Sequence, residues 1–374
     1  MVLTLVGIWW YLSWPVLVDI TDENFLELQK CPACYGDHLC SDVFHRRFDL
    51  TNFTRFNIIR KLFNAKNVYY GIFYQDDQEE EVVIKKLGHD RELAKMDQLM
   101  CDMAQRDTNC VSSLASKWSN GRTLEFHLFK TGLDIEALKC VQNQDMIDFL
   151  ASKAHVSNEN FLTLAMINPE PLIASAFPYA AGWPFPKYYG ACGRLAVFER
   201  VKSPLENYLS SPWATKARLA LQVLQMAKKM SDNEPLGLYL TDWSLDNFAV
   251  TAKLEVKLID LENIVLVNKT VIKTTKAPGW NIDHHSVAFG CEEDQEDCFS
   301  YSVEDLCSHV VSDHNYYGAC QGIFNDLKVT EAMPKDARQK FPMLERLLKE
   351  CSWPSHPGGR IEAARELIEI LKQI

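Results

Sequence analysis

This sequence lacks several features that would assign a chain to a broad class at once. It has no internal repeat, no low-complexity segment and no run of like charge longer than Glu79-Glu80-Glu81, so there is no charged tail. Basic residues are in the minority, because 39 Lys and Arg stand against 50 Asp and Glu, and the formal net charge is −11. A protein that binds a nucleic-acid backbone needs a basic face. We therefore expect no nucleic-acid partner.

Length and hydrophobicity set the scale of the fold. The chain has 374 residues, of which 47% are hydrophobic, and this is enough for one large domain or two lobes. Residues 1–18 carry no charged side chain, and Asp19 ends this short, Trp-rich run. We interpret residues 1–20 as a signal peptide or an uncleaved membrane anchor, although the positive residues that usually begin a signal peptide are missing. A buried strand or helix is the structural alternative.

Cysteine usage points to an oxidising compartment. The chain has twelve cysteines, and an even number behind an apolar leader indicates disulfides formed in the secretory pathway. Sequons at Asn52 and Asn268 fit that compartment. The Cys and His spacing in 31-CPACYGDHLC-40 fits either a zinc knuckle or a loop tied by disulfides. The oxidising compartment favours the loop, and the connectivity cannot be read from spacing.

Hydrophobic patterning predicts a mixed chain of strands and helices. Two β-branched and aromatic stretches around an acidic turn predict a hairpin over residues 66–87. Helical spacing follows over 90–105, with Leu93, Met96, Met100 and Met103 on one face. The other expected elements are an irregular insertion with short helices over 106–160, two strands around a turn in 182–201, an amphipathic helix over 213–232, a strand over 254–267, a loop-rich region over 270–330 and two helices in 343–374.

Four polar residues follow these elements in the order that a protein kinase shows. In 239-YLTDWSLDNF-248, Asp242 is followed by four residues and then Asn247, which matches the kinase catalytic loop. Asp260 ends the apolar run after it and resembles the metal-binding Asp of Asp-Phe-Gly. Upstream, 82-VVIK-85 resembles the kinase Val-Ala-Ile-Lys strand, with Lys85 toward the α- and β-phosphates.

The chemistry of phosphoryl transfer needs these residue types together. The transfer spreads negative charge over several oxygens, and divalent ions held by hard oxygen ligands neutralise it. A carboxylate must lie near the attacking hydroxyl, and a cation must orient the triphosphate. We expect Asp242 to be the catalytic base, Asn247 and Asp260 to hold Mg²⁺ or Mn²⁺, and Lys85 to bind the phosphates of ATP.

The residues next to these acids depart from the kinase pattern. Leu240-Thr241 replaces the His-Arg before the catalytic Asp, and Leu261-Glu262 replaces the Phe-Gly after the metal-binding Asp. Without that glycine, a switch by a flip of this segment is not expected. Glu262 fits either a further metal ligand or a solvated turn residue. Arg360, in a Gly-Gly-Arg turn, occupies the place of a structural kinase Arg.

The nucleotide-binding part of the pattern is also altered. Kinases cover the phosphates with a Gly-rich loop, whereas 67-NVYYGIFY-74 offers only Gly71, so we expect low nucleotide affinity. We expect Glu92 to be the helix carboxylate that pairs with the strand Lys, although it follows that Lys by only seven residues. Asp97 and Asp102 are alternatives, and an unpaired surface acid is a further one.

Beyond the leader, the chain resembles the divergent, secretory-pathway kinase family that includes the "deleted in autism" protein. The resemblance rests on 31-CPACYG-36, 83-VIKKLG-88, 182-GWPFPKYYGACGR-194, 246-DNFAV-250 and 313-DHNYYGAC-320, and it spans residues 21–374. It implies an α+β, two-lobed, kinase-like fold with disulfides, in which an antiparallel sheet plus helix forms the N-lobe and the C-lobe is mainly helical. It also implies a protein of the Golgi lumen or the extracellular space.

These observations divide the chain into expected parts. Residues 1–20 are the leader, 21–65 a Cys-rich segment, 66–200 the N-lobe with an insertion at about 101–185, and 201–374 the C-lobe. Two functions remain open. The first is a kinase that transfers the γ-phosphate of ATP to a luminal or extracellular protein or glycan hydroxyl. The second is a secreted pseudokinase that binds a cell-surface receptor without turnover. Membrane contact is expected only through an uncleaved leader.

Overall fold

The computed structural model describes residues 19–51, 67–75, 78–103, 135–141, 144–287, 300–329 and 333–374. The apolar leader, the sequon at Asn52 and the acidic run 292–297 lie outside these ranges. Two compact units make up the chain. The first unit comprises residues 1–127 and 148–200, and the second comprises residues 128–147 and 201–374. None of the helices in the described ranges is both long and apolar enough to cross a bilayer.

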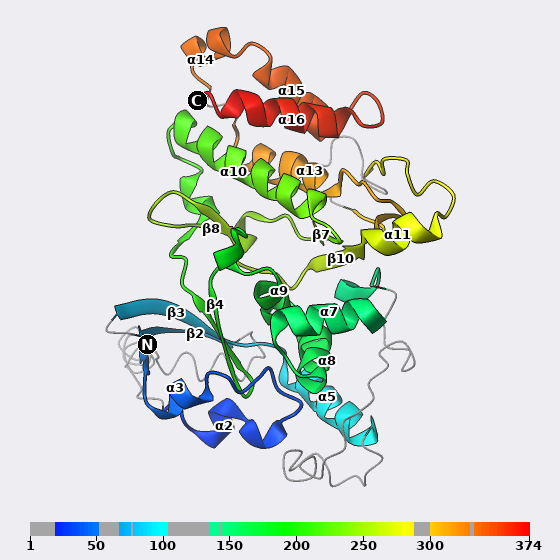
Figure 1. The fold of residues 1–374 in the computed structure, drawn as a ribbon. Coiled ribbons are helices and arrows are strands. Elements are labelled where there is room, and N and C mark those ends of the chain that lie inside the picture. Colours follow the sequence, from blue (N-terminus) through cyan, green and yellow to red (C-terminus); the bar gives the residue numbers. More distant parts are fainter. Residues whose placement is uncertain are drawn as a thin grey trace, which may run out of the picture. The chain divides into compact units, whose positions relative to one another are not determined.

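A five-stranded antiparallel sheet forms the core of the first unit, with strand order β1-β2-β3-β5-β4. Strands β2, β3 and β4 of this sheet are labelled in Figure 1. The strands are β1 (Phe48–Thr51), β2 (Asn67–Gln75), β3 (Gln78–Lys86), β4 (Tyr188–Cys192) and β5 (Leu195–Glu199). The expected hairpin is therefore confirmed as β2–β3. Along β3, Val82, Ile84 and Lys86 are buried while the residues between them are not, which is the alternation of a strand with one covered face.

Helices precede and separate the strands of this sheet along the chain. They are α2 (Glu23–Leu26), α3 (Cys40–Phe44), α5 (Asp90–Met103), α7 (Gln144–Ala154), α8 (Asn158–Ile167) and α9 (Glu170–Ala176). The chain passes from the second unit into the first within α7. In α5, Leu93, Met96 and Met100 are buried, so the apolar face expected for this helix is confirmed.

The Cys-rich segment is tied to the first unit by disulfides. Cys31 is bonded to Cys34, and Cys40 is bonded to Cys192 of strand β4. The zinc-knuckle interpretation is therefore wrong, because these thiolates are not available to a metal. The ring of His38 accepts a hydrogen bond from the backbone N–H of Ala191 at 3.2 Å. Every cysteine in the described ranges is in a disulfide.

Helices dominate the second unit. The longest is α10 (Trp213–Asp232), which begins and ends where the sequence predicts, and α13 (His314–Gly318) continues into the π-helical turn Ala319–Phe324. The others are α11 (Lys269–Thr275), α12 (Val303–Ser308), α14 (Lys335–Lys340), α15 (Leu344–Ser352) and α16 (Gly359–Leu371). Disulfides Cys140–Cys307 and Cys320–Cys351 cross-link this unit.

Two small antiparallel sheets position the polar residues of the second unit. One pairs β10 (Ile264–Asn268) with β7 (Leu236–Leu240), and the other has the order β6-β8-β9, with β6 at Ser203–Pro204, β8 at Phe248–Val250 and β9 at Val256–Leu258. The single strand expected over 254–267 is thus two strands in different sheets. Asp260 lies in the turn between them, because its carboxylate cannot be placed in a buried strand without a partner.

One sequon is incompatible with glycosylation in this fold. The side chain of Asn268 is the N-cap of α11, where its Oδ1 accepts from the N–H of Val271 at 3.1 Å, and the residue is 1% exposed. N-linked glycans are bulky surface groups. We therefore expect no glycan at Asn268, and this sequon gives no support to a secretory compartment.

Candidate active site

Lys85 lies on strand β3 of the first unit and forms an ion pair with Glu170. Its Nζ is 2.5 Å from Oε1 of Glu170, and the ammonium also lies 5.2 Å from the centre of the Phe198 ring. The side chain of Glu170 is 2% exposed and that of Lys85 is 18% exposed. A strand Lys held by a buried helix carboxylate is the arrangement by which protein kinases orient a triphosphate.

The partner of Lys85 differs from the one expected. Glu170 begins α9, and its backbone N–H donates to Oδ1 of Asn168 at 2.9 Å. Glu92 instead accepts from the backbone N–H of His89 at 2.7 Å and caps the start of α5. Glu170 falls inside the stretch interpreted as an insertion. A signal was present in the sequence, because Glu170 is followed by four residues without a polar side chain, and such an acid needs a partner when the helix is buried.

The two alternative acids do not supply that partner in the described contacts. Asp97 is buried and accepts from the guanidinium of Arg194, which also donates through Nε to the backbone oxygen of Ala33 at 2.9 Å. Asp102 is exposed and accepts from Nε2 of Gln98 at 2.8 Å. Asp97 therefore joins α5 to the Cys-rich segment.

Gly71 lies in the middle of strand β2 and not in a loop. It pairs with Leu50 of β1 and Val82 of β3. A Cβ at this position would lie 2.7 Å from the backbone oxygen of Asp49, so the close approach of β1 accounts for the glycine. The expectation that Gly71 lies in a loop that covers the phosphates is wrong. A role of Gly71 in nucleotide binding stays a prediction. The connection between β1 and β2, residues 52–66, contains no glycine and lies outside the described residues.

In the second unit, Asp242 follows strand β7 and is exposed. Hydrogen bonds hold the residues on each side of Asp242. The N–H and the Oγ1 of Thr241 donate to the backbone oxygen of Asn263 at 2.8 and 3.0 Å. Oγ of Ser244 donates to Oδ1 of Asp242 at 2.9 Å. An exposed carboxylate on a fixed turn can accept a proton from a bound hydroxyl.

Asn247 is brought beside both expected acids. Its Nδ2 donates to the backbone oxygen of Asp242 at 3.2 Å and to Oγ of Ser244 at 3.0 Å. Its backbone oxygen accepts from the N–H of Ile259 at 2.8 Å, which precedes Asp260. Oδ1 of Asp260 accepts from the N–H of Glu262 at 3.3 Å. The structure thus gathers three of the predicted site residues in one place.

This donor set is suited to a hard divalent cation. Nδ2 of Asn247 is engaged in two hydrogen bonds, which fix the amide group, and its Oδ1 is the atom of this side chain that could coordinate a metal. Amide and carboxylate oxygens are the ligands that Mg²⁺ and Mn²⁺ prefer. The described residues contain no preassembled group of three or more His, Cys, Asp or Glu that would hold a metal alone. A metal here would share its coordination with phosphate oxygens, as in kinases.

Helix α13 fixes the backbone just before Asp242. Oδ1 of Asn315 accepts from the N–H of Leu240 at 3.0 Å, and the Nε2 of His314 lies 2.7 Å from the oxygen of Leu240. The indole of Trp243 donates to the same oxygen at 2.9 Å. Burial lowers the pKa of His314 to about 4, so the ring is neutral near pH 7 and donates from Nε2 to the carbonyl. These residues take over the anchoring role where kinases have His-Arg.

Arg360 is a structural residue, as expected. Its Nη1 lies 2.5 Å from Oδ2 of Asp313, and both side chains are buried. Nη1 also donates to the backbone oxygen of Ser286 at 3.0 Å, and Oδ1 of Asp313 accepts from the N–H of Ser286 at 2.7 Å. The pair therefore fixes the segment at Ser286 to the start of α13.

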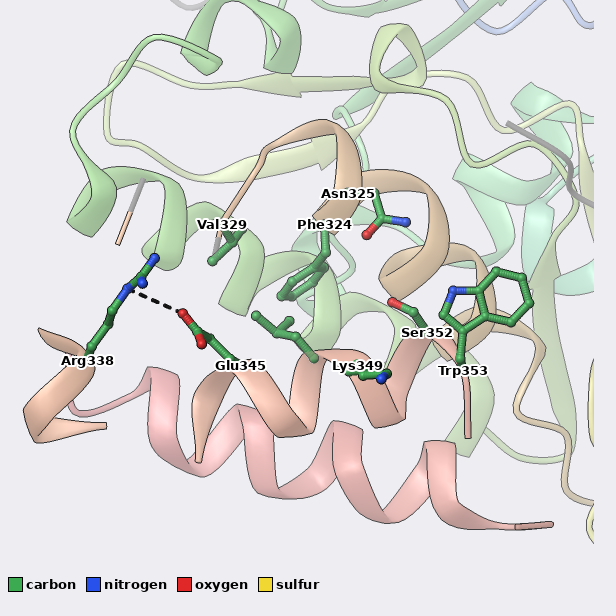
Figure 2. A pocket seen from close by; sticks show the side chains of 9 residues that line it. Phe324, Asn325, Val329, Arg338, Glu345, Lys349, Ser352 and Trp353 are labelled. Atoms are coloured by element: carbon green, nitrogen blue, oxygen red, sulfur yellow. Dashed lines mark ion pairs between the residues drawn. The ribbon is translucent and has the colours of Figure 1, made fainter. Parts of the chain in front are cut away.

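A separate pocket of about 470 Å³ lies among the C-terminal helices of the second unit (Figure 2). Phe324, Val329 and Leu348 are apolar residues of its lining, and Trp353 stands at one end. At the other end Arg338 and Glu345 form an exposed ion pair at 3.3 Å. Asp242, Asn247 and Asp260 do not line it.

Comparison with known proteins places the chain in a family. Residues 161–354 match the family described as "Protein-kinase domain of FAM69". The chain is 33% identical to human "Divergent protein kinase domain 2A" over 386 aligned residues, which cover 95% of this chain and 89% of that protein. The Xenopus tropicalis protein of the same name is 31% identical with the same coverage.

A more distant relative is human "Divergent protein kinase domain 2B", 25% identical over 94% of this chain and 84% of that protein. Among solved structures, the Rv3197–erythromycin complex from Mycobacterium tuberculosis has a TM-score of 0.30 at 10% identity, over 62% of this chain and 52% of that one. The matched residues 161–354 include Glu170 and the Asp242 loop, whereas Lys85 precedes them. The chain belongs to the divergent protein kinase domain family that contains the kinase domain of FAM69.

Proposed function

We propose that this protein is a metal-dependent phosphotransferase that uses ATP. The observation that supports it most strongly is the 2.5 Å ion pair between Lys85 and Glu170. Burying a carboxylate and a Lys costs desolvation free energy that their mutual attraction often does not repay, so such a pair is weak evidence for stability alone. In kinases this pair must be in place for catalysis. The two residues lie 85 positions apart in sequence, on β3 and α9, so local structure does not account for their contact.

The residues of the Asp242 loop would carry the chemistry. The acceptor oxygen forms a bond to the γ-phosphorus, the bond from that phosphorus to the ADP oxygen breaks, and Asp242 accepts the proton of the acceptor hydroxyl. Asn247 and Asp260 would hold the metal, which when bound neutralises charge on the transferred phosphoryl group. Lys85, oriented by Glu170, would position the α- and β-phosphates.

The compartment and the subfamily are part of the same proposal. Four disulfides join described cysteines, and disulfides persist in oxidising compartments such as the secretory pathway. We place the protein in the Golgi lumen or outside the cell, in the subfamily of the "deleted in autism" protein. Its acceptor is a hydroxyl of a luminal or extracellular protein or glycan.

Nucleotide binding is the first test. The melting temperature of the full chain is measured with 5 mM ATP and Mn²⁺ or Mg²⁺, because a ligand that binds the native state raises it by mass action. We expect a metal-dependent rise of about 2–4 °C, which corresponds to ~1 kcal/mol for a domain of this size. Asp260→Ala should abolish the rise. Asp246→Ala, which removes an exposed acid of the same loop, is the matched control and should retain it.

A second candidate function is a pseudokinase ligand for a cell-surface receptor. It is favoured by the glycine-free connection between β1 and β2 and by Leu261-Glu262 after Asp260. Under this function, ATP with either metal would leave the melting temperature unchanged in wild type and in both variants. Transfer of labelled phosphate from ATP to any acceptor, lost in Asp242→Asn, would instead decide for the enzyme.

A further inference from the structure

Residues 31–34 form a Cys-Pro-Ala-Cys loop in the first unit, and a disulfide joins the two ends of this loop. The phosphotransferase chemistry proposed above does not use it. A disulfide stabilises a fold mainly by restricting the unfolded chain, and the effect grows with the length of the loop that it closes. The Cys31–Cys34 bond spans 3 positions, whereas the Cys40–Cys192 bond spans 152. A role as a structural cross-link therefore accounts for the longer bond better than for the shorter one.

The two cysteines of the loop differ in their access to solvent. Cys34 is 2% exposed, whereas Cys31 is partly exposed. The rate of thiol–disulfide exchange depends on which sulfur an attacking thiolate can reach. Because Cys31 is the residue that an external thiolate can approach, the sulfur of Cys34 would be the leaving group.

A side-chain amide donates to the sulfur that would leave. Nδ2 of Asn160, on α8, lies 3.4 Å from Sγ of Cys34 and 2.8 Å from the backbone oxygen of the same cysteine. Oδ1 of Asn160 accepts from Oγ of Ser157 at 2.7 Å, which fixes the orientation of the amide. A neutral sulfur is a weak acceptor, whereas hydrogen bonds to an ionised acceptor are stronger. The amide of Asn160 therefore stabilises Cys34 more as a thiolate than as half of a disulfide.

Other side chains of the first unit hold the loop and place cations beside it. Nε of Arg194 donates to the backbone oxygen of Ala33 at 2.9 Å, and the guanidinium also pairs with Asp97 and Glu27. Lys30 directly precedes the loop, and its Nζ lies 3.5 Å from Oδ2 of Asp97. Lys and Arg next to a cysteine favour its thiolate form. The surroundings of the loop thus favour the reduced form through two cations as well as through the amide.

We propose that Cys31–Cys34 is a redox-active disulfide that exchanges with a dithiol. One thiolate of the dithiol attacks Sγ of Cys31, so that a mixed disulfide forms, the Cys31–Cys34 bond breaks and Cys34 leaves as a thiolate beside Asn160. The second thiolate then attacks the dithiol's own sulfur in the mixed disulfide, which closes the dithiol's disulfide and releases Cys31. The dithiol is oxidised by two electrons, this chain is reduced by two, and two protons pass from the dithiol to the cysteines.

Reduction of the full chain in graded mixtures of reduced and oxidised dithiothreitol tests this inference. Free thiols are trapped with iodoacetamide, and mass spectrometry measures the reduced fraction of each disulfide. We expect Cys31–Cys34 to be half reduced at a ratio of reduced to oxidised reagent about a hundredfold below that for Cys40–Cys192, which corresponds to ~59 mV for a two-electron couple. Cys40–Cys192 is the internal control. A difference of less than about tenfold, or one in the opposite direction, overturns the inference.

Asn160→Ala tests the role of the amide in stabilising the leaving group. The initial rate of Cys31–Cys34 reduction is measured with dithiothreitol, a small dithiol, and with reduced thioredoxin, a protein dithiol. We expect the variant to lower the rate by about tenfold, the loss that corresponds to one hydrogen bond to a charged group. Thr163→Val is the matched control, because Oγ1 of Thr163, also on α8, donates to the backbone oxygens of Glu159 and Pro32 at 3.1 and 3.5 Å. It should change the rate by less than about twofold.

The two dithiols distinguish the kind of partner. Reduction by both assigns a protein dithiol, reduction by dithiothreitol alone assigns a small dithiol, and reduction by neither overturns the inference. Equal slowing in Asn160→Ala and Thr163→Val would show that Asn160 only positions the loop. Far-UV circular dichroism checks that each variant folds, and Asn160→Leu, which also lacks a donor, replaces Asn160→Ala if that variant unfolds. These measurements use no ATP, so the redox inference and the phosphotransferase function can stand or fail separately.

Discussion

The Nζ of Lys85 on strand β3 lies 2.5 Å from Oε1 of Glu170 at the start of helix α9. We expect Glu170→Gln to raise the dissociation constant for ATP with Mn²⁺ by about tenfold, because the Lys85 ammonium loses the carboxylate that orients it toward the phosphates. A tenfold change corresponds to ~1.4 kcal/mol of binding free energy. Isothermal titration calorimetry on the full chain measures it.

Glu92 provides the matched control for this prediction. Glu92→Gln leaves the Lys85–Glu170 pair untouched and removes only a charge that accepts from the N–H of His89. It should change the ATP dissociation constant by less than about twofold and cost about 0.5–1 kcal/mol of folding stability through the weakened cap. A larger loss of ATP affinity in Glu92→Gln than in Glu170→Gln would contradict the assignment of Glu170.

Asp313→Asn is expected to destabilise the second unit. The change leaves the buried guanidinium of Arg360 without its carboxylate, and breaking a buried pair costs about 3–5 kcal/mol. Chemical unfolding monitored by tryptophan fluorescence measures the loss. Glu345→Gln breaks the exposed pair with Arg338, whose side chains are both 50% exposed, and should cost less than ~1 kcal/mol. Equal losses in the two variants would refute a structural role for Asp313 and Arg360.

Local patterns predicted local structure well in this chain. Helix α10 runs from Trp213 to Asp232 as expected, because its apolar stripe and the flanking Pro212 mark the buried face and the start of a helix within the local sequence. The turn that carries Asp242 and Asn247 could also be predicted from the sequence, because a spacing of five residues brings these two residues close together. The hydrogen bond from Nδ2 of Asn247 to the oxygen of Asp242 is the structural counterpart of that spacing.

Long-range partners could not be predicted in the same way. Lys85 and Glu170 are 85 residues apart, and Cys40 and Cys192 are separated by 152, so nothing in the local sequence relates the members of either pair. Glu92 lies on the helix that follows the Lys85 strand, yet a Glu at the third position of a helix satisfies its own helix end. Choosing Glu170 required knowing that α9 is buried.

Stability should depend on pH through His314. Burial lowers the pKa of this His to about 4 in the fold, against about 6.5 in an unfolded chain. Between these values the unfolded state binds more protons, so the stabilisation is complete above pH ~6.5 and is lost as the pH falls toward 4, by about 3 kcal/mol in total.

Unfolding free energies from pH 4.5 to 8 check this dependence. His314→Gln should reduce the slope below pH ~6.5 by about one proton, or ~1.4 kcal/mol per pH unit. Above pH 7.5 the difference between the variant and wild type should be independent of pH, which serves as the internal control. An unchanged acid slope in the variant would show that His314 is protonated equally in both states. Burial also lowers the pKa of His284, which adds to the wild-type slope in the same direction.

Gly318→Ala should disturb the loop of Asp242 and Asn247, although Gly318 lies outside that loop in the sequence. A Cβ on Gly318 would lie 2.1 Å from Cδ1 of Trp243, so the indole must move, and with it the hydrogen bond to the oxygen of Leu240. Such overpacking typically costs about 1–3 kcal/mol. We expect the melting shift with Mn²⁺ and ATP to fall by at least about half, because Asn247 lies four residues after the displaced Trp.

Gly359→Ala is the control for the added methyl group. Its Cβ would meet Oε1 of Glu350 at 2.6 Å, so this side chain must give up its hydrogen bonds from the N–H and Oγ of Ser355 at 2.7 and 2.8 Å, but the contact does not involve Trp243. This variant should keep the full melting shift. If Gly318→Ala also keeps it, the position of Trp243 does not control the loop of Asp242 and Asn247, and α13 would be only a structural support. If Gly318→Ala loses the shift while its far-UV circular dichroism remains that of wild type, the packing of Trp243 on α13 controls the geometry of the proposed metal site.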